Sequence, residues 1–198
     1  MVFPGRVGGS THSFQRGTKR LFDIIIATTG LVVLSPLILL VALAIKLDSR
    51  GPIISIHVRH SYTNRRVHVL RFRDTTIQPS HGDSSPTRIG RVLRWSGVEG
   101  LPMLLNVLVG EMSIVGPCLY TTPPGLLNEH TLGPAPNNEF RPGLTGWAQV
   151  RTSARDETSQ ARLKRMEDDL FYILNWSLTF DARIIWMSLL CKHFYLLD

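Results

Sequence analysis

The sequence predicts a helix-rich mixed α/β protein, in which a re-entrant N-terminal membrane helix hairpin carries a small cytoplasmic domain. Three observations lead to this fold class. Residues 24–45 form an apolar run without a charged side chain. Two short β-branched segments, residues 53–58 and 67–72, are typical of a β-hairpin. Short segments with helical spacing follow, and they predict amphipathic interfacial helices around the domain.

The apolar run is long enough to cross a membrane. As one helix it would extend ~33 Å at ~1.5 Å per residue, against ~30 Å for a bilayer core. Ser35 and Pro36 lie at its middle, and proline disrupts a helix because it lacks an N–H. Both flanks are basic, which favours the cytoplasmic side: Arg16, Lys19, Arg20, Lys46, Arg50 and Arg59. We therefore predict a helix broken at Ser35 and Pro36 that re-enters the same side. A straight transmembrane helix and a buried core helix stay open as alternatives.

The remaining organisation follows from length and composition. The 198 residues predict a flexible tail over residues 1–18 and a single domain over residues 19–198. Within it we expect the membrane helix at 21–47 and a cytoplasmic region at 48–198. No cleaved signal peptide is expected. Cys118 and Cys191 are far apart in the sequence, so neither a disulfide framework nor a zinc site is indicated.

The net charge of +7 is concentrated in one segment. Residues 51–100 contain no lysine but eight arginines, whose planar guanidinium groups bind phosphate with paired hydrogen bonds: Arg59, Arg65, Arg66, Arg71, Arg73, Arg88, Arg91 and Arg94. Beside a membrane helix, anionic lipid or a diphosphate substrate is favoured over nucleic acid, for which no recognition motif is present. A solvated basic surface stays open as the alternative.

The segment after residue 76 is predicted to alternate between loops and helices. Residues 77–86 are rich in Pro, Ser and Gly and predict a loop. Residues 88–94 alternate arginine with apolar residues, as in a helix lying on a membrane surface. Pro102 suits the first position of a helix that ends near Leu108, with Gly100 as its cap. Glu99 would then lie at the positive end of that helix and stay ionised.

The C-terminal part is predicted to end in helices. Residues 118–138 form a proline-rich insertion, residues 141–150 a turn leading into a short strand, and residues 180–197 a final apolar helix. Residues 151–169 show a weak helical pattern. We expect Asp169 and Asp181 to cap or bridge helices, and Trp147 and Trp176 to serve as core or interfacial anchors.

Nine sequence pieces in order carry a family resemblance: KRLFDIIIA, the Ser35-Pro36 break, KLDSRGP, RFR, RIGRVLR, LP, NVLVGEMSIVGP, RPGLTGWAQV and DLFYILNWSLTFD. Over residues 18–188 the chain resembles the bacterial sugar transferases. These are monotopic polyprenyl-phosphate phosphoglycosyl transferases of exopolysaccharide, capsule and O-antigen synthesis.

The resemblance implies an enzyme of the bacterial inner membrane with its catalytic region in the cytoplasm. Such an enzyme transfers a sugar phosphate from a nucleoside-diphosphate sugar, usually UDP-linked, to polyprenyl phosphate, with Mg²⁺ as cofactor. An aspartate of an Asp-Glu pair attacks the β-phosphate. Here the corresponding catalytic residue is Glu99, which is also a possible metal ligand. The expected substrate-binding residues are Arg59, Arg71, Arg73, Arg88, Arg91, Arg94 and Arg141. Partners implied besides the substrates are anionic lipid, and either a second copy or other polysaccharide-synthesis proteins.

The chain departs from this pattern at its catalytic pair, which is Glu99-Gly100. It also has Cys118 where the family usually has the arginine of Pro-Arg-Pro, and His57 where the family commonly has glutamine. Two hypotheses follow: a transferase in which Glu99 replaces the aspartate, and a catalytically silent paralogue that regulates or scaffolds a polysaccharide-initiating transferase.

Overall fold

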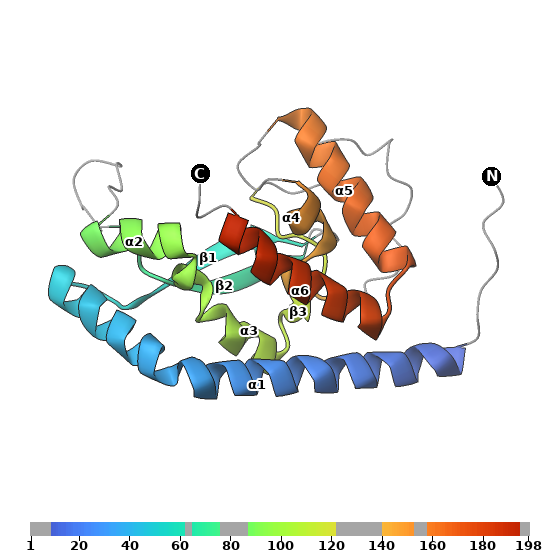
Figure 1. Ribbon diagram of the computed structural model, residues 1–198, viewed down its shortest axis with the longest axis horizontal. Coiled ribbons are helices and arrows are strands. Elements are labelled where there is room, and N and C mark those ends of the chain that lie inside the picture. The colour runs from blue at the N-terminus through green and yellow to red at the C-terminus, as the bar shows by residue number, and fades with distance from the viewer. Residues whose placement is uncertain (1–8, 62–64, 76–86, 122–139, 153–157, 195–198) are drawn as a thin grey trace.

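The computed structural model describes residues 9–61, 65–75, 87–121, 140–152 and 158–194. Its helix-rich mixed composition confirms the predicted fold class in outline (Figure 1). Two sheets of two strands each lie among the helices, β1-β2 antiparallel and β3-β4 parallel. In chain order the elements are α1 (Gly9–Asp48), β1 (Ile54–His60), β2 (Arg66–Phe72), α2 (Arg88–Ser96), the 3₁₀ turn η1 (Val98–Gly100), α3 (Met103–Val109), β3 (Ser113–Val115), β4 (Gly143–Thr145), α4 (Trp147–Arg151), α5 (Ser159–Leu174) and α6 (Leu178–Phe194).

Helix α1 is continuous through Pro36, so the predicted interruption at Ser35 and Pro36 is wrong. Proline leaves the carbonyl four residues earlier, that of Val32, without its helical donor. The Ser35 hydroxyl donates to this carbonyl at 2.8 Å and replaces the missing N–H. The helix therefore bends rather than breaks, and Figure 1 shows it as one bent ribbon instead of two helices folded back on each other.

The apolar surface of α1 is largely exposed, which the core-helix alternative does not explain. Val32, Leu39 and Leu47 have 68%, 70% and 79% of their surface accessible. Among the described residues, one helix is long and apolar enough to cross a membrane, over Gly17–Asp48. An uncovered apolar surface of this size indicates membrane association.

Helix α1 begins inside residues 1–18, and the expected flexibility of that segment stays a prediction. The helix begins at Gly9, so the backbone of residues 9–18 is helical. Once a helix exists, each added residue gains a hydrogen bond without a new nucleation cost. A polar segment joined to a long apolar helix can therefore extend it.

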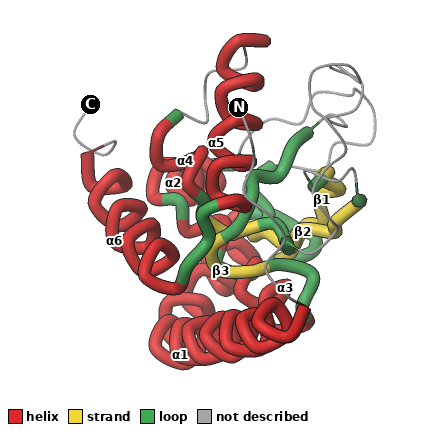
Figure 2. Tube along the Cα trace, turned by 90° about the vertical axis from the view of Figure 1, so that its right-hand side faces the viewer, coloured by secondary structure: helices red, strands yellow, loops and turns green. Residues whose placement is uncertain are grey.

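The main core lies above α1, between the β1-β2 hairpin, α3 and the C-terminal helices (Figure 2). Ala27 of α1 packs in this cluster with residues of β2, α3, α5 and α6, namely Val67, Val107, Tyr172 and Ile184. A second cluster joins the C-terminal part of α1 to β2 and α2 through Val41, Ile45, Phe72 and Leu93. The elements that follow α1 are thus packed along it in two separate clusters.

Most predicted local elements are confirmed. The hairpin, the helix near residues 88–94 and the final helix are present as β1-β2, α2 and α6. Pro102 is the N-cap of α3, whereas Gly100 belongs to the preceding turn and not to the cap. Cys118 is free and buried. The predicted loop at 77–86 and nearly all of the insertion at 118–138 lie outside the described residues.

Candidate functional site

One face of the hairpin carries the polar residues of the candidate site. β1 and β2 pair antiparallel with Ser55 opposite Arg71 and His57 opposite Val69. Because side chains alternate along a strand, Ser55, His57 and Arg59 share one face with Arg71. We call these four residues the polar face. The opposite face of β1 carries Ile54, Ile56 and Val58.

Glu99 contacts the polar face through an ion pair with Arg71. The Arg71 Nη2 atom donates to Glu99 Oε1 at 2.6 Å, and the side chains are 32% and 15% exposed respectively. A charge-assisted hydrogen bond of this length is among the stronger polar contacts in proteins. Glu99 lies in η1 and therefore precedes α3, which begins after Pro102. The ion-pair partner of its carboxylate is Arg71. The two residues were predicted as nucleophile and substrate ligand, and the structure brings them together.

His57 and Arg59 complete the polar face on β1. His57 Nε2 and Ser55 Oγ are 3.0 Å apart. Arg59 donates to the Thr121 hydroxyl. Partial burial lowers the pKa of His57, and the nearby charges of Arg71 and Arg59 lower it further, whereas Glu99 acts in the opposite direction. The electrostatic environment of His57 thus disfavours added positive charge.

Arg73 is near this face in sequence but has a structural role. Its side chain is buried, and it donates to the Arg50 and Ser49 carbonyl oxygens at 2.9 Å each. These bonds hold the turn after α1, where Gly51 has a φ of 135°. A β-carbon at Gly51 would lie 1.9 Å from Arg73 Nη1, so glycine is needed there. The position of Arg73 does not support its predicted contact with substrate.

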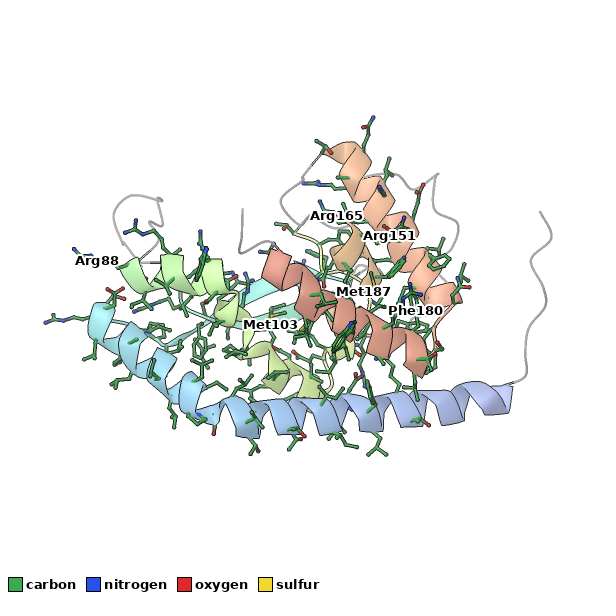
Figure 3. The ribbon with its side chains drawn as sticks, in the orientation of Figure 1. Arg88, Met103, Arg151, Arg165, Phe180 and Met187 are labelled. Atoms are coloured by element: carbon green, nitrogen blue, oxygen red, sulfur yellow. The ribbon has the colours of Figure 1, made fainter. Side chains whose placement is uncertain are left out.

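Helix α2 presents two of its arginines outward. Arg88 and Arg91 are exposed and line a shallow hollow with Val92 and Trp95. These four residues follow the spacing of one helix face, and Figure 3 shows Arg88 at the outer end of α2. Such a surface suits lipid head groups more than a closed substrate pocket.

Arg94 and Arg141 occupy separate surroundings. The Nε atom of Arg94 donates to Asp74 Oδ2 at 2.6 Å, which links α2 to the end of β2. Arg141 is exposed and lies near Gly110 with Arg20. Gly110 follows the C-terminal end of α3, whereas Glu99 precedes the N-terminal end. The structure therefore does not bring Arg141 to Glu99.

The residues near Glu99 do not fit a magnesium site. Mg²⁺ is usually held by one or two carboxylates together with substrate phosphates. The carboxylate of Glu99 is engaged by Arg71, that of Asp74 by Arg94, and the residue after Glu99 is Gly100. In the described part of the chain, no cluster of three or more His, Cys, Asp or Glu side chains could hold a metal ion.

A buried ion network, unrecognised in the sequence, fixes the domain to α1. Lys19 Nζ lies 2.8 Å from Asp181 Oδ2 and 3.3 Å from Asp23 Oδ1. Asp23 also accepts hydrogen bonds from the Ser113 hydroxyl and the Ile114 amide. The sequence did contain a signal for this network, because Asp23 and Asp181 are single acidic residues at the edges of apolar segments. The predicted structural role of Asp181 is confirmed.

Asp169 is likewise structural. It is fully buried and accepts hydrogen bonds from the Cys118 amide at 3.0 Å and the Tyr120 hydroxyl at 2.6 Å. It thereby ties α5 to the segment after β3. Burial raises the pKa of Asp169 to about 7, although the Tyr120 and Cys118 hydrogen bonds favour its ionised form.

Comparison with known proteins gives one family. A model described as bacterial sugar transferase matches residues 14–193. An undecaprenyl-phosphate glucose phosphotransferase of Komagataeibacter xylinus is 40% identical, over 86% of this chain and 35% of the relative. A UDP-glucose:undecaprenyl-phosphate glucose-1-phosphate transferase of Escherichia coli (strain K12) is 34% identical, over 88% of this chain and 40% of the relative.

A shorter relative matches nearly end to end. The exopolysaccharide production protein PSS of Rhizobium leguminosarum bv. phaseoli is 38% identical, over 84% of this chain and 90% of the relative. Against the two longer relatives, this chain spans only 35% and 40% of their length.

Proposed function

The chain belongs to the bacterial sugar transferase family, and from this premise we propose that it transfers a sugar phosphate from a UDP-linked sugar to polyprenyl phosphate. This reaction would initiate an exopolysaccharide or a related glycan. The relatives named for UDP-glucose and undecaprenyl phosphate support these two substrate classes. The observation that carries the proposal is the contact between Glu99 and Arg71, which joins a carboxylate to a phosphate-binding side chain.

The proposed chemistry uses Glu99 as the nucleophile. A carboxylate oxygen of Glu99 bonds to the β-phosphorus, and the bond from that phosphorus to the bridging oxygen breaks, so its electron pair leaves with UMP. An oxygen of polyprenyl phosphate then bonds to the same phosphorus, and the bond to Glu99 breaks. Oε1 of Glu99 is held by Arg71, so Oε2 is the candidate attacking atom. Arg71 and Arg59 would offset negative charge on the transferring group.

The proposed location is the bacterial inner membrane, with the region after α1 facing the cytoplasm. The exposed apolar residues of α1 and the basic residues at both ends of the run support this. A bend at Pro36 would let both ends of α1 return to one side. Cysteines at Ser10 and Ser49, in a variant lacking Cys118 and Cys191, should label equally with an impermeant thiol reagent added outside intact cells. Labelling of only one position would show a helix that crosses the membrane.

The activity test measures nucleoside monophosphate released from a panel of UDP-sugars by the purified chain, with polyprenyl phosphate and Mg²⁺ supplied. Release that Glu99→Gln abolishes supports the proposal. A double change, Glu99→Asp with Gly100→Glu, restores the family pair and should raise turnover by about 100-fold, since a misplacement of about 1 Å can cost that much. If only the restored pair is active, the chain is a silent paralogue. If neither is active on any donor, the proposed function is wrong.

A further inference from the structure

The donor-binding region of this chain differs from its family in net charge. The family pair has two carboxylates, whereas here Gly100 leaves Glu99 as the single one. Building on the proposed function, we propose that the chain binds the diphosphate of its donor without a divalent cation. The guanidinium groups of Arg71 and Arg59 then supply the positive charge on the polar face.

The carboxylate oxygens that could serve as metal ligands support this inference. A cation at the free oxygen of Glu99 would lie beside the positive charge of Arg71, whose Nη2 atom is 2.6 Å from Oε1. Asp74, the other acid that acts electrostatically on the polar face, is paired with Arg94 at 2.6 Å. Each carboxylate thus already has a fixed positive partner. A divalent ion would compete with both guanidinium groups and gain few ligands from the described residues.

The charge balance points the same way. Asp74 and Arg94 neutralise each other, so the polar face and Glu99 together have two arginines against one carboxylate. The excess positive charge attracts a diphosphate and repels a metal cation. The pKa of His57 agrees with this excess of positive charge, because Arg71 and Arg59 lower it beyond the effect of burial. In the family pattern the second carboxylate would cancel that excess, and a metal ion would be needed to restore it.

Arg71 also has a donor left over for a ligand. Its Nε atom is buried and has no hydrogen-bond partner among the described residues. A buried donor without a partner is costly to the folded protein. Because Nε is shielded from solvent in the free chain, a phosphate oxygen would satisfy it only after neighbouring side chains move aside, with Nη2 still on Glu99. Arginine can serve both anions because its five N–H groups point in fixed, separate directions.

The test measures UDP-glucose binding to the purified full chain in lipid nanodiscs by calorimetry, in EDTA and in MgCl₂. We expect dissociation constants that agree within about threefold, a difference below 1 kcal/mol. Binding that is more than about tenfold weaker in EDTA overturns the inference. Because calorimetry reports binding alone, the result does not depend on turnover.

Two variants sharpen the test. Gly100→Glu returns the second carboxylate, and a β-carbon there meets only Met103 Sδ, at 3.4 Å, so the change is sterically possible. This variant should bind more than about tenfold tighter with Mg²⁺ than in EDTA, because the added charge creates a cation site. Arg71→Gln should lose binding in EDTA. Arg66→Gln, on the same strand but the opposite face, should bind like the wild type in both buffers.

The outcomes separate the inference from the proposed function. Metal-dependent binding by the wild type, or unchanged binding by Arg71→Gln in EDTA, contradicts the inference and leaves the transferase proposal intact. If neither the wild type nor Gly100→Glu binds any UDP-sugar in either buffer, the donor class itself is wrong, and both proposals fail.

Discussion

Removing the Lys19 ammonium should weaken the attachment of the domain to α1. Lys19 lies between two carboxylates whose side chains are 2% and 0% exposed, those of Asp23 and Asp181. Deleting one partner of a buried pair typically costs about 3–5 kcal/mol, since the remaining charge is left uncompensated. We expect the lower end of this range for Lys19→Met, because each aspartate keeps other donors. Asp181, for example, still accepts from the Tyr172 hydroxyl at 2.7 Å.

The assay is unfolding of the detergent-solubilised chain, followed by tryptophan fluorescence. At about 2–4 °C per kcal/mol for a chain of this size, Lys19→Met should lower the unfolding midpoint by roughly 6–12 °C. Lys164→Met is the matched control, because Lys164 is exposed on α5. Adding Asp181→Asn to Lys19→Met should recover part of the loss by removing one unpaired charge. A shift no larger than that of the control would refute the reasoning.

Three further predictions concern other parts of the chain. The free energy of unfolding should fall as pH rises from about 4 to 7, because burial holds the pKa of Asp169 at about 7 in the folded chain, above its ordinary value of 3.8 in the unfolded chain, so the folded state holds the extra proton. This fall should be on the order of 4 kcal/mol across the pH window, and Asp169→Asn should abolish it, as urea unfolding at each pH would measure. Gly90→Ala should destabilise the chain by about 1–3 kcal/mol in the same assay, because its β-carbon would lie 1.9 Å from the Asp74 carbonyl oxygen; a neutral effect would mean that α2 shifts freely. Changing Arg88 and Arg91 to glutamine should weaken binding to anionic vesicles by about 2 kcal/mol and lower its salt dependence, whereas unchanged flotation would leave them as ordinary surface charge.

Local patterns in the sequence were enough for the elements that depend on short-range periodicity. The β1-β2 hairpin and α2 each have a repeat of side chains that only one secondary structure places on one face, and the apolar run is recognised by its length without a charged residue. The order of the sequence motifs was also enough to identify the family. Both kinds of information lie in neighbouring residues, so no contact between distant segments was needed to find them.

The tertiary structure alone decided what individual side chains do. Arg71 and Arg73 belong to the same short motif, yet one contacts Glu99 and the other is buried against the Ser49 and Arg50 carbonyls. Nothing in the motif distinguishes them, because their partners come from other elements.

The sequence by itself thus determined the class of protein, the long apolar segment and the single carboxylate of the altered pair. Only the folded chain decided that this carboxylate is held by Arg71, and that Lys19 joins acids from the two ends of the chain. The physical reason is that charge pairing acts over a few ångströms in space, whatever the separation in sequence. Periodicity can be read along the chain, but the partner of a charge cannot.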